Sequence, residues 1–237
     1  MLTFLDHAQV AVFALLFPAV GFVLYRHTAS GSARLDRSPR LPRYVSTMGA
    51  QWLLAGSALT LWAVFERPWS DLGLALDPGT GLVIAVGVAL AAIGLLFEQL
   101  RRVRRASAEH LSDLRRQLRS LEPLLPRNRR ELRAFDALSL TAGFVEELLW
   151  RGYLIWYLQQ LAPLWLAAGG SVLLFGLAHA YQGPAAAAKT GAVAAVLTAL
   201  YLISGTLWPS IALHAAIDML QGRTAYEVLR KRGELVV

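Results

Sequence analysis

Long apolar runs separated by short polar segments dominate the pattern along the chain. Residues 8–25, 44–65 and 78–97 are runs of 18, 22 and 20 positions without a charged residue. A helix needs about 20 apolar residues to cross a bilayer, so these runs predict three transmembrane helices. Apolar stretches bounded by Gly and Pro turns predict four further spans, at 136–158, 163–181, 186–204 and 208–221. The expected fold is an all-α, polytopic bundle of about seven spans.

Composition supports a membrane protein. The chain is 56% hydrophobic and 16% charged, whereas an average soluble domain carries about 25% charged residues. Asp6 occupies the place of the basic region that a cleavable signal peptide would need, so we expect the first run to remain as a span. The sequence contains no cysteine, which excludes disulfides, thiolate metal ligands and cysteine nucleophiles.

The charged residues predict an orientation. Loop 26–43 has five arginines and segment 101–133 has eleven, whereas loop 66–77 has only Arg67 against three acidic residues. Basic loops stay in the cytoplasm. We therefore expect the N-terminus outside and the C-terminal tail in the cytoplasm, which requires an odd number of spans. The net charge of +7 reports this orientation, and we expect no nucleic-acid partner.

A basic amphipathic stretch lies between the third and fourth spans. Leu111, Leu114, Leu118 and Leu121 recur at helical spacing, with arginines on the other faces. This pattern predicts a helix that continues from the third span and lies on the membrane surface or on the protein itself. Contact with anionic lipid suits such a segment. Recruitment of a separate partner is the alternative.

Ionisable residues gather in the C-terminal spans. An ionisable residue costs about 2.5–3.5 kcal/mol at the centre of a span and therefore usually has a partner or a function. The six residues concerned are Glu146, Glu147, Arg151, His179, His214 and Asp218. Any one of them could serve packing, as an ion pair or a hydrogen-bonded histidine. Their joint occurrence on three spans indicates a functional site.

Helical spacing predicts how these residues pair. Glu147 and Arg151 stand four positions apart on one face and can form an ion pair, and His214 and Asp218 repeat that spacing. Glu146 is rotated by about 100° from Glu147, which leaves it free for proton transfer. Counted along the helices, Glu146 lies about 15 Å and His214 about 12 Å from the cytoplasmic face. We expect them to converge in the cytoplasmic half of the bilayer.

A carboxylate with two imidazoles and a further acid suits the activation of water against a carbonyl group. Other hydrolytic designs are disfavoured. The sequence has no H-E-x-x-H zinc motif. It also has no glycine-flanked serine at Ser171. Asp136 stands at the start of the fourth predicted span, so Asp218 is the one aspartate inside the predicted C-terminal spans, and an intramembrane aspartate pair is missing.

Three short motifs in order resemble those of the CPBP family, which includes type II CAAX prenyl endopeptidases, bacteriocin-processing proteins and Abi-type proteins. They are E-E-x-x-x-R at 146–151, F-x-x-x-H at 175–179 and H-x-x-x-D at 214–218. The resemblance covers about residues 136–222, and the first 130 residues share only the character of membrane helices. Asp218 stands where many members have Asn.

The resemblance implies an intramembrane glutamic-type peptidase that opens toward the cytoplasm. Glu146 with His179 would activate the attacking water. His214 with Asp218 would stabilise the oxyanion, provided that Asp218 is protonated or instead orients His214. The resemblance also implies supporting roles for three residues: an ion pair of Glu147 with Arg151 that holds the site, and Phe175 packed beside His179.

These expectations define one membrane domain in three parts: residues 1–135 with three spans and the basic helix, the CPBP-like core at 136–222, and a cytoplasmic tail at 223–237. We expect no cofactor, with zinc held by Glu146, His179 and His214 as the alternative. The expected partners are a bilayer, taken to be a bacterial plasma membrane, and a membrane-protein or lipidated-peptide substrate. A non-catalytic immunity or scaffold protein and a proton-coupled transporter are the other functions considered. Nothing in the sequence indicates an oligomeric state.

Overall fold

A computed structural model describes residues 2–29, 40–76, 78–107, 109–118 and 121–231. These residues form helices and turns, and no strand occurs among them. The all-α prediction is confirmed. Most of the basic loop at 26–43, Arg119 of the amphipathic stretch and the last residues of the tail lie outside the described residues.

Among the described residues, seven helical stretches overlap the seven ranges predicted as spans, and the fifth, at 15 residues, is shorter than its predicted range. The first is α1 (Phe4–Val10), the π-helix η1 (Ala11–Leu16) and α2 (Phe17–Ala29), and it is followed by α4 (Leu41–Val64) and α5 (Thr80–Arg105). The later stretches are α7 (Arg129–Glu147) with the π-helix η4 (Leu148–Tyr153) and α8 (Leu154–Gln159), then α9 (Leu164–Ala178), α10 (Pro184–Ser204) and α11 (Trp208–Arg230). The described elements also include the short helix α6 (Ser112–Leu118) and three short 3-10 turns, which are η2 (Glu109–Leu111), η3 (Glu122–Leu124) and η5 (Ala180–Gln182).

Local sequence explains several helix ends. Thr3 and Asp6 form a capping box at the start of α1, and the side chain of Asn128 accepts a hydrogen bond from the backbone N–H of Glu131 at the start of α7. Gly205 ends α10 with a φ of 67°, a left-handed conformation that glycine adopts without steric cost.

Three helical stretches are long and apolar enough to cross a membrane: Phe4–Arg26, Thr80–Arg105 and Pro184–Ser204. Their outer faces carry large exposed apolar side chains, and only 11% of the most apolar window of α5 is buried. Leu95 is 75% exposed and Trp165, on the shorter apolar helix α9, is 71% exposed. Soluble monomers rarely expose apolar surface on this scale. Together with the three apolar helices, this exposure indicates a membrane protein.

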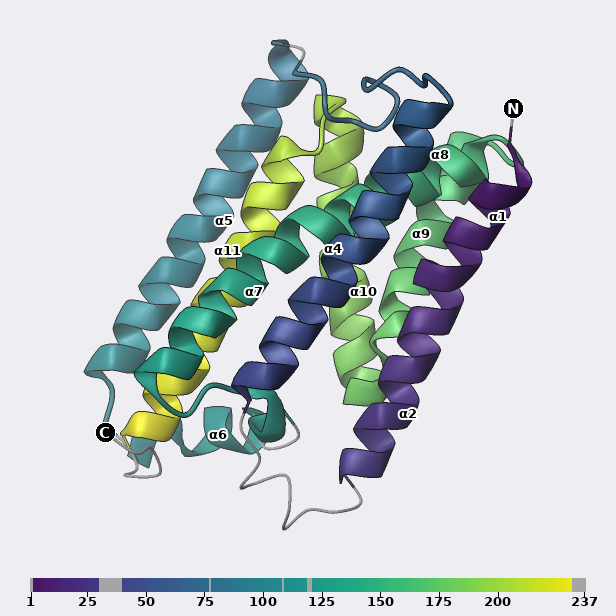
Figure 1. The fold of residues 1–237 in the computed structure, drawn as a ribbon. Helices are drawn as coiled ribbons and strands as arrows, with labels where there is room; N and C mark the ends of the chain where they lie inside the picture. The colour runs from purple at the N-terminus through teal and green to yellow at the C-terminus, as the bar shows by residue number, and fades with distance from the viewer. Residues whose placement is uncertain (1, 30–39, 77, 108, 119–120, 232–237) are drawn as a thin grey trace.

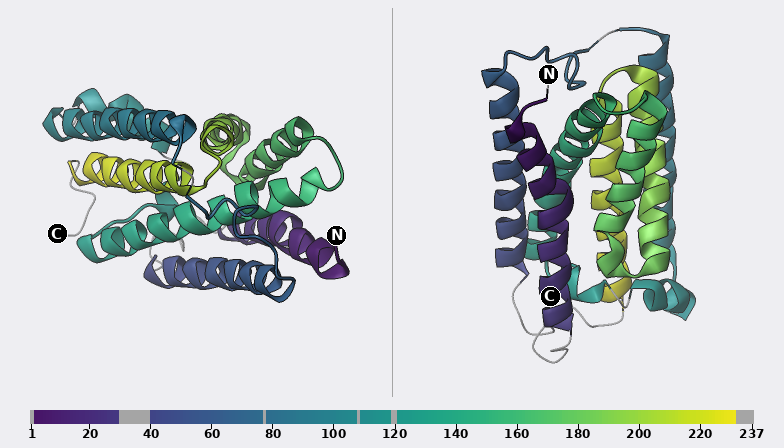
Figure 2. Two further views of the ribbon diagram at one scale, coloured as in Figure 1. Left: turned by 90° about the horizontal axis from the view of Figure 1, so that it is seen from above. Right: turned by 90° about the vertical axis from the view of Figure 1, so that its right-hand side faces the viewer.

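Helix α7 lies in the middle of the bundle. The ribbon shows α7 between α4 and α11, with α5 on the far side of α11 (Figures 1 and 2). The close approach of α7 and α11 depends on small residues. A Cβ atom added to Gly143 would lie 2.7 Å from Cβ of Ala215, and one on Gly222 would lie 2.3 Å from the ring of Phe135. These two helices carry most of the ionisable residues identified above.

The basic amphipathic stretch packs on the protein itself. Leu111 contacts Val103 and Val228, and Leu118 packs against a cluster that contains Ala225 and Leu229. The stretch does not continue from the third predicted span, because Ala106 is extended and ends α5. The same apolar contacts explain why α11 runs to Arg230, nine residues beyond its predicted end at 221. The described part of the tail is therefore mostly helical.

Candidate active site

The wide helical turn η4 follows directly after the two adjacent glutamates. Glu146 and Glu147 are the last residues of α7, and Arg151 lies within η4. Ser171 of α9 donates a hydrogen bond of 2.6 Å to the carbonyl of Trp150 inside this turn. The ring of Phe13, from the other π-helix, packs edge-on against Trp150 at 5.7 Å between centroids. Single π-helical turns often occur at functional sites.

The ion pair predicted from the i,i+4 spacing is present. Nη1 of Arg151 donates to Oε1 of Glu147 at 2.8 Å, and the two side chains are 1% and 0% exposed. Nη2 of Arg151 donates to the carbonyl of Ala194 on α10, at 3.4 Å. The guanidinium carbon also lies 4.5 Å from the ring centroid of Phe175. Arg151 therefore connects η4 to α9 and α10.

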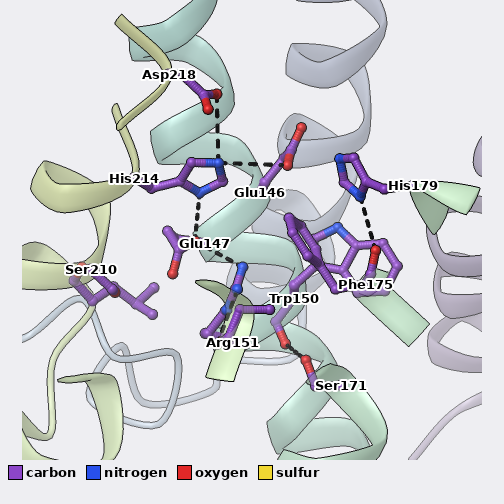
Figure 3. A network of polar contacts seen from close by, with 12 residues as sticks. Glu146, Glu147, Trp150, Arg151, Ser171, Phe175, His179, Ser210, His214 and Asp218 are labelled. Atoms are coloured by element: carbon purple, nitrogen blue, oxygen red, sulfur yellow. Dashed lines mark hydrogen bonds and ion pairs between the residues drawn. The ribbon is translucent and has the colours of Figure 1, made fainter. Parts of the chain in front are cut away.

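His214 of α11 binds the same carboxylate oxygen. Its Nδ1 lies 2.7 Å from Oε1 of Glu147, and because a charged carboxylate only accepts, Nδ1–H is the donor. The opposite nitrogen, Nε2, lies 3.9 Å from Oε2 of Glu146 and 3.7 Å from Oδ2 of Asp218. Figure 3 shows His214 between these groups. Glu147 fixes the ring, so Nε2 is the nitrogen that faces Glu146 and Asp218.

Glu146 differs from Glu147 in its surroundings. Its side chain is 22% exposed, whereas that of Glu147 is fully buried. Oε1 of Glu146 accepts a hydrogen bond of 2.9 Å from Nε2 of Gln51 on α4, and Oε2 faces His214. The spacing argument predicted that Glu146 would point away from the ion pair, and the structure agrees, but the contact with Gln51 was not predicted.

His179 lies on the other side of Glu146 from His214 (Figure 3). Its Nδ1 donates to the carbonyl of Phe175 at 2.9 Å, which leaves Nε2 available. Among the side chains that the structure describes, His179 makes no direct hydrogen bond to Glu146. Phe175 is 3% exposed, and its ring lies 4.7 Å from that of His179. As expected, Phe175 packs beside the histidine.

The six ionisable residues singled out from the sequence therefore lie together, with the ring of Phe175 packed beside His179. Comparison with known proteins agrees with this grouping: residues 131–220 match the family model described as type II CAAX prenyl endopeptidase, Rce1-like. Residues 131–220 are thus similar to this family of endopeptidases, and we call them the Rce1-like segment. The family is one of proteases. No curated protein and no solved structure matches the chain.

The Rce1-like segment contains the whole ionisable cluster but not all of its contacts. It begins inside α7 and ends inside α11, so α1 to α5 lie outside it. Gln51 comes from this unmatched half. The signal that could have found it was present in the sequence, because it is the one amide residue in the uncharged run 44–65. An amide in a predicted span carries a desolvation cost, smaller than that of a charge, unless it is hydrogen-bonded.

The Rce1-like segment contains residue types that bind zinc. His179 and His214 each have one ring nitrogen fixed by a hydrogen bond and the other available, which is a usual arrangement for metal-binding histidines. Over the described residues, however, no group of three His, Cys, Asp or Glu side chains is placed to hold a metal ion. The residue types fit zinc, and their placement in this structure does not.

Proposed function

We propose that the protein is an intramembrane endopeptidase that hydrolyses a peptide bond near the C-terminus or membrane anchor of a membrane-associated protein or lipidated peptide. The Rce1-like segment supports a protease of this kind. The observation that carries the proposal is the contrast within one helix turn: Glu146 is 22% exposed beside Nε2 of His214, whereas Glu147 is fully buried in an ion pair. A carboxylate that water can reach suits a general base.

In the proposed reaction Glu146, assisted by His179, accepts a proton from water, and the resulting hydroxide adds to the carbonyl carbon of the substrate. His214, as an imidazolium with a proton on each ring nitrogen, then donates a hydrogen bond from Nε2–H to the oxyanion. The C–N bond breaks, and the proton held by Glu146 passes to the leaving amine. The hydrogen bond of Nδ1–H to Glu147 supports this role, because it directs Nε2 away from the ion pair.

Asp218 is proposed to orient His214. Its carboxylate lies 3.7 Å from Nε2 and its side chain is 38% exposed. A charged carboxylate beside a developing oxyanion would be repulsive, so the direct role in oxyanion binding is less suitable for an aspartate than for an asparagine. Attraction between the carboxylate and the imidazole ring instead favours one position of the ring.

The proposed topology has seven spans, with the N-terminus outside and the C-terminus in the cytoplasm of a plasma membrane. Two features support it. The N-terminus and loop 66–77 lie at one end of the bundle, whereas the basic segment around α6 and the end of α11 lie at the other (Figure 1). Basic residues at a single end are the pattern that cytoplasmic loops show. The active site would open toward that basic end.

Activity of the purified protein in liposomes tests the function. The probes are a farnesylated peptide with a C-terminal CAAX sequence and an unlipidated transmembrane peptide. Loss of a general base typically lowers the rate by about 10²–10⁴-fold, so Glu146→Gln should lose cleavage by at least about 100-fold. Comparison of protein termini in cells that carry the native protein or Glu146→Gln would then identify the natural substrate.

Glu131→Gln is the matched control. Glu131 is a buried acid on the same helix, 9% exposed, and it accepts a hydrogen bond from the backbone N–H of Arg127 at the end of α7 remote from Glu146. This variant should cleave as the native protein does. If Glu146→Gln cleaves at the native rate, the peptidase mechanism is wrong. If neither the native protein nor Glu146→Gln cleaves, and Glu146→Gln still supports the cellular function of the native protein, a scaffold or immunity function replaces the proposal.

Water activation is proposed to use only the side chains of the chain. Activity should therefore survive exhaustive chelation followed by metal analysis. Loss of activity that zinc alone restores would replace this part of the proposal with a zinc site at Glu146, His179 and His214.

A further inference from the structure

Helix α4 places one buried amide against the proposed catalytic carboxylate. Gln51 is 5% exposed, and its Nε2 donates to Oε1 of Glu146 at 2.9 Å. The two residues are 95 positions apart, and Gln51 lies outside the Rce1-like segment. The contact is thus supplied by a part of the chain that the family match does not describe.

A second buried glutamine shows what a packing role looks like. Gln9 is 8% exposed. Its Nε2 donates to the carbonyl of Leu54 at 3.0 Å, and its Oε1 accepts from the hydroxyl of Ser57 at 2.9 Å. Both ends of this amide are satisfied by α4. Buried polar groups that hold helices together are normally hydrogen-bonded in this complete way.

Gln51 does not follow that pattern. Its Oε1 is buried and has no hydrogen-bond partner among the residues that the structure describes. Among the described residues, its side chain makes one hydrogen bond, the one to Glu146. An unsatisfied buried acceptor costs stability, so the amide is poorly suited to packing alone. Its placement is explained if the contact with Glu146 serves the reaction.

The geometry shows what the contact does. The terminal torsion of a glutamate side chain is broad and roughly two-fold, so a carboxylate bound at neither oxygen can rotate freely. Gln51 holds Oε1, and Oε2 is then the oxygen that lies 3.9 Å from Nε2 of His214. One donor on one oxygen is sufficient to fix which oxygen faces the imidazole.

We propose that Gln51 is a positioning residue for Glu146, so that the active site includes α4 as well as the Rce1-like segment. This inference rests on the proposed peptidase function. Gln51 holds Oε1 and thereby presents Oε2 to the attacking water. It does not touch the substrate, so its loss should lower kcat and leave KM nearly unchanged.

Two substitutions of similar volume test the role. Gln51→Met removes the donor, and Gln51→Glu replaces it with a group that accepts when ionised. A small displacement of a catalytic group can cost up to about 100-fold, so kcat should fall by about 10- to 100-fold in both variants, with KM within about two-fold. The control is Gln9→Met, the same replacement at the other buried glutamine, which should keep the native kcat. Thermal midpoints in detergent show whether each variant is folded.

A double-mutant cycle separates positioning from a general structural effect. In Glu146→Asp the shortened carboxylate no longer reaches Gln51, so adding Gln51→Met should change its residual single-turnover rate by less than about two-fold. If Gln51→Met lowers the rate by the same factor in the native protein and in Glu146→Asp, the two residues are not coupled and the positioning role is overturned. If the native protein cleaves, Glu146→Gln does not, and Gln51→Met cleaves at the native rate, the role of Gln51 is overturned and the proposed function stands. Absence of cleavage by the native protein would overturn the proposed function and this role together.

Discussion

The buried carboxylate of Asp6 and the carboxylates of the candidate active site differ in their surroundings. Asp6 in α1 is 0% exposed and is surrounded by donors. Both of its oxygens accept from Arg67, at 2.8 and 2.7 Å, and it also accepts from the hydroxyl of Tyr153 at 2.5 Å. The backbone N–H and hydroxyl of Thr3 donate to it at 2.8 Å each. Every hydrogen-bonding position of this carboxylate group is occupied.

Arg67 is held equally firmly. Its guanidinium carbon lies 5.4, 4.9 and 4.4 Å from the rings of Trp62, Phe65 and Trp156. Burial alone would lower the pKa of Arg67, but the hydrogen bonds and charge of Asp6 outweigh burial and raise it. This cluster of Asp6, Arg67, Tyr153 and Thr3, called the N-terminal cluster below, joins α1 to the loop after α4 and to the end of η4.

The carboxylates of the candidate active site are incompletely satisfied. Oε1 of Glu147 accepts from both Arg151 and His214, but Oε2 is buried without a partner among the described residues, as is Nε of Arg151. Glu146 accepts one hydrogen bond and is partly exposed. The N-terminal cluster is therefore fully hydrogen-bonded, whereas in the candidate active site Glu146 is partly exposed and Glu147 and Arg151 keep buried atoms without partners among the described residues.

Removal of the buried cation gives the largest expected effect. Arg151→Met leaves Glu147 charged and buried without its cation, and breaking such a pair costs about 3–5 kcal/mol. Unfolding in mixed detergent micelles measures this loss. The double variant Glu147→Met with Arg151→Met should recover most of the stability, because an apolar pair can replace a buried ion pair at little cost. It should remain inactive, because His214 loses the acceptor for Nδ1–H.

The unfolding of Arg151→Met can also show that the ion pair of Glu147 with Arg151 is not buried. A loss below about 1 kcal/mol, the value typical of exposed ion pairs, would mean that the active-site pair is solvated. It would then be no different in kind from the surface pair of Arg102 with Glu98.

A substitution that forces α7 and α11 apart gives the next largest expected effect. Gly143→Ala places a Cβ 2.8 Å from the backbone nitrogen of Ala215, so α7 and α11 must separate. Overpacking of this kind costs about 1–3 kcal/mol. Because the two helices carry Glu146 and His214, cleavage should also fall by about 10- to 100-fold. The N-terminal cluster should be unaffected, since neither helix carries Asp6 or Arg67.

The control for this variant is Gly87→Ala on α5. A Cβ there meets nothing within 4 Å, and alanine favours helix, so activity should be unchanged and stability unchanged or slightly higher. Equal activity of Gly143→Ala and the native protein would show that the active site does not depend on close approach of α7 and α11.

Tyr153→Phe gives the smallest expected effect and tests whether the N-terminal cluster serves stability alone. It removes one donor to Asp6, and a hydrogen bond to a charged group contributes about 1.5–3 kcal/mol. Because Arg67 and Thr3 remain, we expect a loss near the lower limit, about 1.5 kcal/mol, with cleavage within about two-fold of native. Tyr157→Phe, which removes an exposed hydrogen bond to His7, is the control and should cost less. A large loss of activity with little loss of stability would show that the N-terminal cluster takes part in the reaction.

Much of the active-site cluster could be predicted from the sequence because its contacts are local. The apolar runs indicated the helices, and the i,i+4 spacing predicted the pair of Glu147 with Arg151, since residues four apart share one face of a helix. The cost of ionisable residues in apolar helices singled out Glu146, His179, His214 and Asp218. Prediction was weakest at helix ends, where Ala106 terminated α5 and apolar packing extended α11.

The contacts between helices could not be predicted in this way. Glu147 meets His214 across 67 positions, Glu146 meets Gln51 across 95, and Asp6 meets Tyr153 across 147. Helical periodicity determines which residues share a face, but it contains no information on which faces pack together. That choice depended on the tertiary structure, where small residues such as Gly143 and Ala215 let α7 and α11 approach closely. The sequence by itself determined the helices and their local ion pairs, and only packing decided which of them share one site.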